Sequence, residues 1–422
     1  MAYRSTEGIA LTDRNRHALL LQGPSSFFMA QLGKELRAKG MRVSRIHLCP
    51  GDWLMWRGGG GRIYRGSLTD WPEYVGEFMQ AEGITDLICL GSGRAYHRAA
   101  IDAAPANVRV TSIEHGYLRP NRLLVEPGGS GGDSSFPRDW ATIRRLAELQ
   151  APEADQVQFK SSFLEYAVLD VVWNLSNVAL GWFMTPGYQR HSVDHPLIEY
   201  AGWIRKGVLR RTRLRALAKA EAKLAAHKGP LFILPLQLET DYQIRFYGSG
   251  RTMRQELERL IGSFAARAPK DAMFVVKVHP LDNGNAPWQS ICKTAAMAAG
   301  VPDRVVYFDG GNLDQMIAKA TGVVTVNSTV GLTAVLAGCP VQTLGWAIYD
   351  LPCLTHQGGV DKFWNRPTPP TPEYVEVFTK ALESSIHVHG AFDGSGVQPG
   401  AKAIADKITA SPPYPAATKA QL

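Results

Sequence analysis

The sequence predicts an α/β protein with two doubly wound parallel sheets, one in each half of the chain, and a helical segment between them. Apolar strand-like runs alternate with helix-like segments over about the first 120 residues, and the same alternation starts again near residue 230. Neighbouring parallel strands need a crossover connection, so this alternation is typical of a parallel sheet with helices on both faces. A chain of 422 residues is also too long for one ordinary core, which favours two domains.

The first half of the chain contains four strand-like runs. After the first run, Phe28, Leu32 and Leu36 recur at helical spacing until Gly40 ends the helix, and a second helix is expected at about 71–82. The strands are expected at residues 17–23, 41–48, 84–91 and 108–114. This order of strands and helices predicts a Rossmann-like domain.

The middle of the chain, residues 140–228, contains no comparable strand and is expected to be helical. Residues 163–183 come nearest to a membrane span, but Glu165 and Asp170 make them too polar to cross a bilayer cheaply. We interpret this segment as one or two amphipathic helices, which either pack on a core or contact a membrane surface or lipid acceptor. Residues 205–229 form a strongly basic helix, which is either a solvated face or an anion-binding one.

A second strand–helix series follows in the last half of the chain. Its strands are expected at residues 230–237, 272–279, 304–310, 322–327 and 340–345. The expected domains are a Rossmann-like domain at 1–150, a helical connection at 151–228, a second Rossmann-like domain at 229–366, and C-terminal helices with a disordered Pro/Ala-rich end at 367–422. Two such domains predict a cleft between the carboxyl ends of both sheets.

Composition and charge indicate a globular protein with an anionic partner. The chain is 45% hydrophobic and 20% charged, with a net charge of +8 and an isoelectric point near 9.2. Nucleotide phosphates, acidic sugars, anionic lipids and nucleic acid all suit this charge. Five scattered cysteines indicate reduced core thiols in a cytosolic protein, and the N-terminal residues show no apolar signal-peptide region.

The usual phosphate and metal motifs are missing from the sequence. There is no P-loop, and Gly91 and Gly93 lack the third glycine of a dinucleotide-binding fingerprint. Neither an Asp-x-Asp pair nor a His- or Cys-rich cluster with metal-ligand spacing occurs. We therefore expect chemistry without a metal ion or another cofactor.

Polar residues at two strand ends predict an anion site in the second half of the chain. Lys277 and His279 end one strand, and Asn327, Ser328 and Thr329 stand between another strand and a helix. Hydroxyls and free backbone N–H groups at a helix start favour phosphate, and a cation nearby adds charge-assisted hydrogen bonds. The structural alternative is that Ser328 simply caps the helix.

Carboxylates also follow two strand ends. Glu114 ends a strand of the first half with Arg119 close by, and Gln237, Asp241 and Arg245 follow the first strand of the second half. If Asp241 faces Glu114 across the cleft, the two carboxylates fit a retaining glycosyl transfer, with one as nucleophile and one as acid/base. An ion pair between Glu114 and a neighbouring arginine is the structural alternative.

On these residues the chain resembles the bacterial capsule polysaccharide synthesis proteins, and more narrowly the S-type retaining β-Kdo transferases that begin the lipid-linked capsule primer. The resemblance covers about residues 17–366 and depends on several motifs occurring in order. They are LLLQGPSSFFMAQLGKELRAKGMRVSRIHLCPGDWLMW at 19–56, RAYHRAAI at 94–101, EHGYLRP at 114–120, SSFPRD at 134–139, LQLETDYQIR at 236–245, KVHP at 277–280 and NSTVGLTAVLAGCPVQTLG at 327–345.

The resemblance implies a GT-B fold and a transferase that uses CMP-Kdo as donor and no cofactor. The implied acceptor is a (lyso)phosphatidylglycerol-type lipid, bound on the side of the N-terminal domain, while the nucleotide binds the C-terminal domain. The implied location is the cytoplasm, at the cytoplasmic face of the inner membrane. Capsule assembly proteins are the implied partners, and no nucleic acid is expected.

The resemblance also assigns roles to single residues. Asp241 matches the expected nucleophile and Glu114 the expected acid/base, while His115 departs from the acidic residue expected at that position. The donor- and acceptor-binding residues expected are Gln237, Lys277, His279, Pro280, Asn327, Ser328, Thr329, Arg119 and Arg245. In this interpretation Lys277, His279 and Pro280 hold the cytidylate leaving group.

Two other functions fit the same pattern. Non-hydrolysing nucleotide-sugar epimerases, and transferases for other CMP- or UDP-sugars, share paired doubly wound domains with a histidine at a strand end. A non-catalytic component of capsule polysaccharide export is the second alternative. Discrimination between CMP and UDP would separate the enzymes, and a silent Asp241→Asn exchange would favour the export component.

Overall fold

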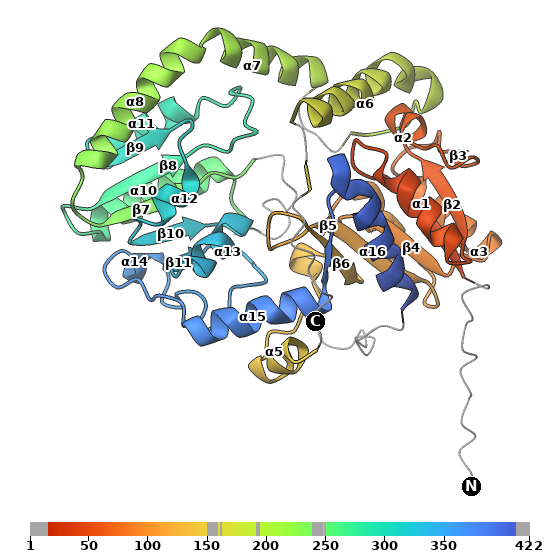
Figure 1. The fold of residues 1–422 in the computed structure, drawn as a ribbon. Helices are drawn as coiled ribbons and strands as arrows, with labels where there is room; N and C mark the ends of the chain where they lie inside the picture. Colours follow the sequence, from red (N-terminus) through yellow and green to blue (C-terminus); the bar gives the residue numbers. More distant parts are fainter. Residues whose placement is uncertain are drawn as a thin grey trace. The chain divides into compact units, whose positions relative to one another are not determined.

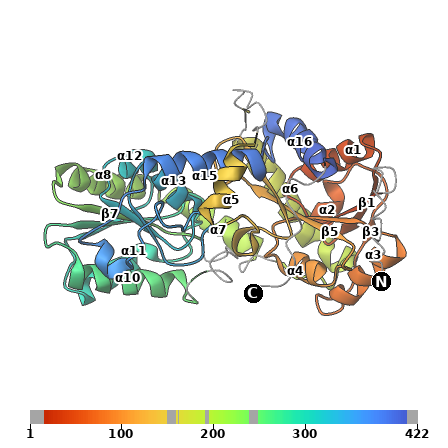
Figure 2. The same cartoon turned by 90° about the horizontal axis from the view of Figure 1, so that it is seen from below.

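The protein is an α/β molecule made of two compact units, as the sequence predicts. A computed structural model describes residues 16–149, 159–160, 163–190, 195–238, 248 and 250–410. Unit 1 consists of Met1–Ser135, Pro152–Gln189 and Ile386–Leu422, and unit 2 of Phe136–Ala151 and Arg190–Ser385. Each unit has its own sheet with helices on both faces (Figures 1 and 2).

The sheet of unit 1 has the strand order β12-β6-β5-β4-β1-β2-β3. Its strands are β1 His17–Leu20, β2 Arg42–His47, β3 Arg62–Ile63, β4 Asp86–Leu90, β5 Arg109–His115, β6 Arg122–Pro127 and β12 His387–His389. The five strands from β5 to β3 pair in parallel, while β6 is antiparallel to β5 and β12 antiparallel to β6. All four predicted strands are present, and β3, β6 and β12 are additional.

Alternate side chains of β1 pack into two hydrophobic cores, one on each face of this sheet. Leu20 packs with Phe28 of α1 and Ile404 of α16, whereas Leu19 packs on the other face with Trp71 of α3. Because successive side chains of a strand point to opposite faces, one apolar run supplies both cores. Figure 2 shows α1 and α16 on one face and α3 and α4 on the other. The helices are α1 Phe28–Ala38, α2 Pro50–Leu54, α3 Trp71–Ala81, α4 Ala95–Asp102, α6 Phe163–Met184 and α16 Val397–Thr409.

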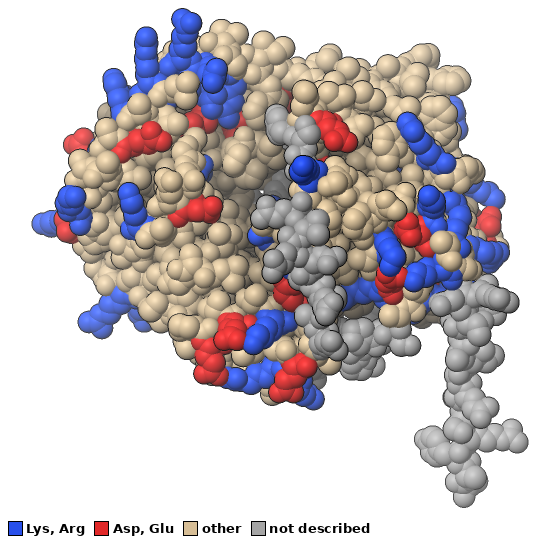
Figure 3. All heavy atoms as spheres, viewed as in Figure 1, with Lys and Arg blue, Asp and Glu red and all other residues tan. Residues whose placement is uncertain are grey.

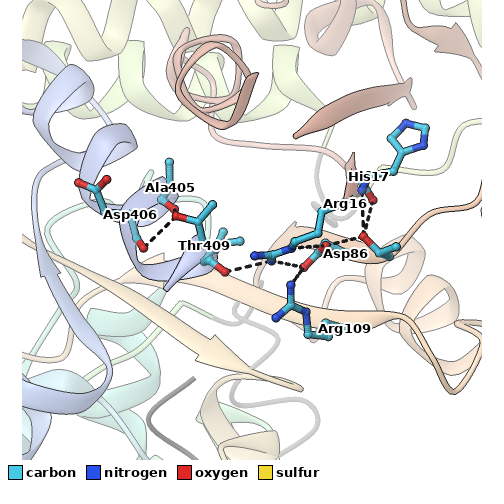
Figure 4. A network of polar contacts seen from close by, with 9 residues as sticks. Arg16, His17, Asp86, Arg109, Ala405, Asp406 and Thr409 are labelled. Atoms are coloured by element: carbon cyan, nitrogen blue, oxygen red, sulfur yellow. Dashed lines mark hydrogen bonds and ion pairs between the residues drawn. The ribbon is translucent and has the colours of Figure 1, made fainter. Parts of the chain in front are cut away.

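A buried ion pair joins the start of β1 to β4 and to the C-terminal helix (Figure 4). Asp86 is 1% exposed, and its Oδ1 lies 2.7 Å from Arg16 Nη2 and 3.0 Å from Arg109 Nη2. The same Arg16 nitrogen donates to the carbonyl of Ile408 in α16 at 3.0 Å. The last helix is therefore tied to the first strand through one guanidinium.

The sheet of unit 2 is entirely parallel, with the order β11-β10-β7-β8-β9. Its strands are β7 Leu231–Pro235, β8 Met273–Lys277, β9 Val305–Phe308, β10 Gly322–Thr325 and β11 Val341–Thr343. From β7 the chain moves outward through β8 to β9 and then returns to β10 on the other side of β7. The switch point of this doubly wound sheet therefore lies between β7 and β10.

The helices of unit 2 start where the sequence supplies caps. Thr252 and Gln255 form a capping box at α10, and Ser328 caps α13. Phe264 of α10 packs with Phe232, Phe274 and Trp364 in the core on one face of the sheet. The helices are α5 Trp140–Ala147, α7 Pro196–Val208, α8 Arg210–Ala226, α10 Met253–Arg267, α11 Trp288–Ala298, α12 Leu313–Ile317, α13 Thr329–Leu336, α14 Val360–Phe363 and α15 Pro372–Ser385.

The units do not coincide with the boundaries expected at residues 150, 228 and 366. The helical middle of the chain divides between them, since α6 belongs to unit 1 and α7 and α8 belong to unit 2. The C-terminal part divides as well, because α15 stays with unit 2 while β12 and α16 return to unit 1. The Pro/Ala-rich end at 411–422 lies outside the described residues.

Candidate functional site

Most of the predicted nucleotide-binding residues lie at the carboxyl edge of the unit 2 sheet. Lys277 is the last residue of β8, and His279 and Pro280 follow two and three residues later. Gln237 follows β7 by two residues, and Asn327 lies between β10 and α13. All five strands are parallel, so these residues gather at one edge, where doubly wound sheets bind their ligands.

Gln237 and Asn327 form a double hydrogen bond across the switch point. The Gln237 amide nitrogen donates to Asn327 Oδ1 at 2.9 Å, and the Asn327 backbone N–H donates to Gln237 Oε1 at 3.2 Å. Gln237 is buried, so this pair is shielded from competing water. It holds the turn after β10 in place and so positions the start of α13.

Ser328 caps helix α13, which is the structural role considered above as the alternative to phosphate binding. Its hydroxyl accepts a hydrogen bond from Val330 N at 3.2 Å, and its carbonyl accepts one from the hydroxyl of Tyr349. A Cβ added at Gly331 would lie 2.2 Å from that hydroxyl, so the close contact requires glycine. Thr329, the first residue of the helix, is half-buried beside Ser328. The Val330 N–H is bonded to the Ser328 hydroxyl, and the Gly331 N–H donates to the Ser328 carbonyl at 2.9 Å, so phosphate binding at this helix start stays a prediction.

A pocket of about 490 Å³ opens beside this edge, between the ends of β8 and β9 and the helices α7 and α8. Lys277, His279 and Pro280 line one side of it, and Trp203 lines the opposite side. Its charged lining residues are Lys206, Arg210, Arg213, Lys277 and Asp309. Four cations against one carboxylate make the pocket suited to a phosphate.

Asp309 organises the cations of the pocket. It accepts a hydrogen bond from Arg213 Nε, and its Oδ1 lies 3.4 Å from Lys206 Nζ. Burial alone would raise the pKa of Asp309, but the hydrogen bond from Arg213 and the charges of Lys206 and Arg213 lower it on balance. Burial lowers the pKa of Lys277, and the charge of Asp309 partly offsets this effect. An ionised Asp309 therefore helps to keep Lys277 protonated.

The ring of His279 has a defined hydrogen-bond direction. Its Nδ1 accepts from the backbone N–H of Leu281 at 3.1 Å, so Nδ1 carries no proton in this arrangement. The proton of the neutral ring then lies on Nε2, which makes Nε2 a donor. A donor beside Lys277 at a strand end suits an anionic oxygen.

Sequence reasoning missed Lys206, Arg213 and Asp309 as site residues. The basic segment 205–229 did provide a signal, since anion binding was one of its two interpretations, and Asp309 stands at a strand end before two glycines. The contact itself could not be predicted, because Lys206 and Asp309 are about a hundred positions apart in the chain.

The remaining predicted residues are not part of this group. Glu114 lies in unit 1, near the end of β5 and opposite Leu124 of β6, and is half-buried. Arg119 is exposed and donates from Nε to the carbonyl of Gly116 at 3.3 Å. Asp241 and Arg245 lie outside the described residues, so the pairing of Asp241 with Glu114 stays a prediction. Among the described residues, no cluster of three or more His, Cys, Asp or Glu side chains is placed to hold a metal ion.

Comparison with known proteins places the chain among capsule proteins, as the resemblance predicted. It is 27% identical over 382 residues to the capsule polysaccharide export protein KpsS of Escherichia coli, covering 89% of this chain and 96% of that protein. It is also 27% identical over 392 residues to the capsule polysaccharide modification protein LipB of Neisseria meningitidis serogroup B, covering 90% and 93%.

Among solved structures, the chain is similar to the β-Kdo 2,7 transferase of KpsC from Thermosulfurimonas dismutans. The TM-score is 0.47 with 15% identity, over 93% of this chain and 99% of that one. The family model described as "Capsule polysaccharide biosynthesis protein" matches residues 85–392, which is well over half of the sequence. The chain belongs to the capsule polysaccharide biosynthesis protein family.

Proposed function

We propose that this protein is a retaining glycosyltransferase that moves Kdo from CMP-Kdo onto a (lyso)phosphatidylglycerol-type lipid. The observation that carries the proposal is the cationic pocket at the carboxyl edge of the unit 2 sheet, with Lys277 and His279 at its wall. Membership of the capsule biosynthesis family supplies the biological setting. The donor, the acceptor and a peripheral location at the cytoplasmic face of the inner membrane come from the motif resemblance.

In this proposal, unit 2 binds the cytidylate and stabilises it as a leaving group. Lys277 and the Nε2–H of His279 donate to the single phosphate, while Pro280 shapes the turn that follows β8. The start of α13, with Ser328 and Thr329, is a second group of donors on the same edge. Charge that builds up on the phosphate as the sugar departs is then met by donors already in place.

The transfer itself is proposed to proceed in two displacements. The carboxylate of Asp241 attacks the anomeric carbon, so that CMP leaves and a covalent glycosyl–enzyme ester forms. Glu114 then removes the proton of the acceptor hydroxyl, whose oxygen displaces Asp241 and forms the glycosidic bond. Two inversions give net retention.

The direct test incubates the protein with CMP-Kdo and a fluorescent lysophosphatidylglycerol analogue and reads the products by mass spectrometry. The expected result is one Kdo residue added to the acceptor with release of an equal amount of CMP. Turnover of UDP-sugars without CMP-Kdo consumption would favour an epimerase-type enzyme. Binding of capsule polysaccharide with no nucleotide consumed would favour an export component, as the name of the E. coli relative suggests.

Exchanging Lys277 for methionine is expected to weaken CMP binding by roughly 10- to 100-fold, since a hydrogen bond to a charged group contributes about 1.5–3 kcal/mol. Methionine keeps the buried apolar stem of Lys277 and removes only its charge. His279→Ala should weaken CMP binding as well, because it removes the Nε2 donor. Titration calorimetry with CMP measures both effects.

The matched control is Lys293→Met, the same exchange at an exposed position of α11. Its CMP affinity should equal that of the unaltered protein. Unchanged affinity in both Lys277→Met and His279→Ala would exclude this edge of the sheet as the nucleotide site.

A further inference from the structure

Helix α6 turns Asn174 and Asn177 toward unit 1 together with one large apolar residue, Trp173, while most of its other large apolar residues are exposed. Asn177 Oδ1 accepts from the backbone N–H of Gly51 at 2.7 Å, and Ser25 donates to Asp170 Oδ1 at 3.1 Å. Asn174 and Asn177 are 7% and 9% exposed. Helices on soluble proteins show the opposite order, with the apolar stripe facing the core.

The exposed side of α6 is predominantly apolar, with Glu165 as an exposed charged residue near its start. Its exposed large side chains are Leu164, Tyr166, Val168, Val171, Val172, Leu175, Val178, Leu180, Trp182 and Phe183. Val168 is 51% exposed and Trp182 is 76% exposed. An apolar surface of this extent marks a site that another molecule covers.

Within the part of the chain that the structure describes, α6 is also the one helix that is long and apolar enough to cross a membrane, judged by length and composition. Only 11% of its most apolar 18-residue stretch is buried. Its hydrogen bonds to Gly51 and Ser25, however, fix one side of the helix to unit 1. A helix with one side fixed to a folded unit and the other side apolar is suited to lying on a bilayer rather than crossing it.

The carboxyl end of α6 has the residues found at membrane–water interfaces. Trp182 and Phe183 are both largely exposed there. The guanidinium of Arg65 lies 5.9 Å from the centre of the Phe183 ring and donates to the carbonyl of Met184 at 3.4 Å. Aromatic rings beside a cation favour the headgroup region of a bilayer.

Unit 2 carries a second face of the same kind on α7. Ile204 and Val208 are 69% and 78% exposed, while the opposite side of the helix places Gly202 against the loop at 283–285 and buries Lys206. The next helix, α8, is basic along its length. Figure 3 shows Lys and Arg side chains gathered over the region where Figure 1 places α7 and α8. The exposed cations of α8 are Arg210, Arg211, Arg215, Lys219 and Lys223.

We propose that the exposed apolar side of α6 in unit 1 and that of α7 in unit 2 are two separate surfaces, each of which docks on an anionic phospholipid bilayer, and that the cations of α8, which directly follows α7, contact its headgroups. Apolar side chains next to a dense row of cations complement a negatively charged lipid surface, and neither feature alone selects this partner. The proposal goes beyond the location proposed above by naming the surface that binds. Docking depends on neither the donor sugar nor the catalytic residues, so it can be tested independently of the transferase activity.

Vesicle flotation of the whole protein tests this docking. The protein should float with vesicles made of equal parts phosphatidylcholine and phosphatidylglycerol, and much less with phosphatidylcholine alone. Added salt should weaken the binding, because it screens the cations of α8. Failure to float with the phosphatidylglycerol vesicles at low salt would overturn the proposal.

Two apolar variant sets locate the surface. Val168→Ser with Leu175→Ser changes α6, and Ile204→Ser with Val208→Ser changes α7; all four side chains are exposed, so the fold should be kept. Each set should lower vesicle binding by about tenfold or more, because each serine replaces an aliphatic side chain whose transfer out of water favours docking. The matched control, Met297→Ser with Leu149→Ser, changes exposed apolar residues elsewhere and should float as the unaltered protein does.

A third set, Arg211→Gln with Arg215→Gln, should lower binding to phosphatidylglycerol vesicles and remove most of its salt dependence. Sedimentation without lipid tests whether a second copy of the chain covers this face instead. A dimer that dissociates in the α6 variant set would assign the face to the second copy and overturn the bilayer proposal. Transfer to a water-soluble acceptor should be unchanged in all three sets. If the unaltered protein transferred no Kdo to this acceptor, the proposed transferase function would be refuted, while the docking proposal would still hold.

Discussion

Glu114→Gln is expected to lower the rate of Kdo transfer by about 10²- to 10⁴-fold, the usual contribution of a general acid or base. The amide is nearly isosteric with the carboxylate but cannot accept the proton of the acceptor hydroxyl. Glu114 belongs to unit 1 and the proposed cytidylate site to unit 2, so CMP affinity should not change. Initial rates with CMP-Kdo, together with calorimetry of CMP binding, measure both quantities.

Asp241→Asn should have a larger effect than Glu114→Gln, because it removes the nucleophile and with it the covalent intermediate. Intact-protein mass spectrometry of Glu114→Gln should reveal a Kdo adduct, since the second displacement is slowed more than the first. Glu73→Gln, at an exposed position of α3, is the matched control and should retain full activity. An Asp241→Asn protein as active as the unaltered one would remove the nucleophile assignment.

Asp86→Leu should destabilise unit 1 by about 3–5 kcal/mol, the typical cost when a buried ion pair loses one partner. The exchange leaves the guanidinium of Arg16, which is 3% exposed, without its carboxylate. Urea unfolding followed by fluorescence and circular dichroism should show an earlier transition for unit 1.

Two further variants separate charge burial from simple loss of a contact. Arg109→Gln removes the second cation that contacts Asp86. Because the Arg109 side chain is 44% exposed, this exchange should lower the free energy of unfolding by about 1 kcal/mol or less. Arg16→Met combined with Asp86→Leu removes both buried charges and should recover much of the stability lost by Asp86→Leu. Equal loss in the double and single variants would show that packing, not an unpaired charge, dominates this site.

The strands that are buried on both faces gave the clearest signal in the sequence. Strands such as β4 and β8 are buried along their whole length and apolar except for Asp86 at the start of β4 and Lys277 at the end of β8, and such an apolar run is easy to recognise. By contrast, β12 has only three residues, His387–His389, two of them histidines. Its place beside β6 depends on a segment more than 250 positions away, which no local pattern can reveal.

The candidate site was predictable to the extent that it depends on strand ends. Lys277, His279 and Asn327 were identified because parallel strands bring their carboxyl ends to one edge, whatever the details of packing. The contribution of α7 and α8 was not identified, since Lys206 of α7 and Arg213 of α8 meet the pocket through their ion pairs with Asp309, and Arg213 also through the packing of α8 on β9. Periodicity predicts a helix but not the sheet edge on which it packs.

The tie between Arg16 and Ile408 also has a consequence for biosynthesis. Unit 2 ends at Ser385, so every strand and helix it needs has been translated before β12 and α16 are made. Unit 1 begins first but lacks an edge strand and the helix that covers Leu20 and Phe28 until the final residues emerge. The N-terminal part of the nascent chain therefore has one side of its sheet covered by α1 alone until β12 and α16 have been made, whereas all of unit 2 precedes them in the chain.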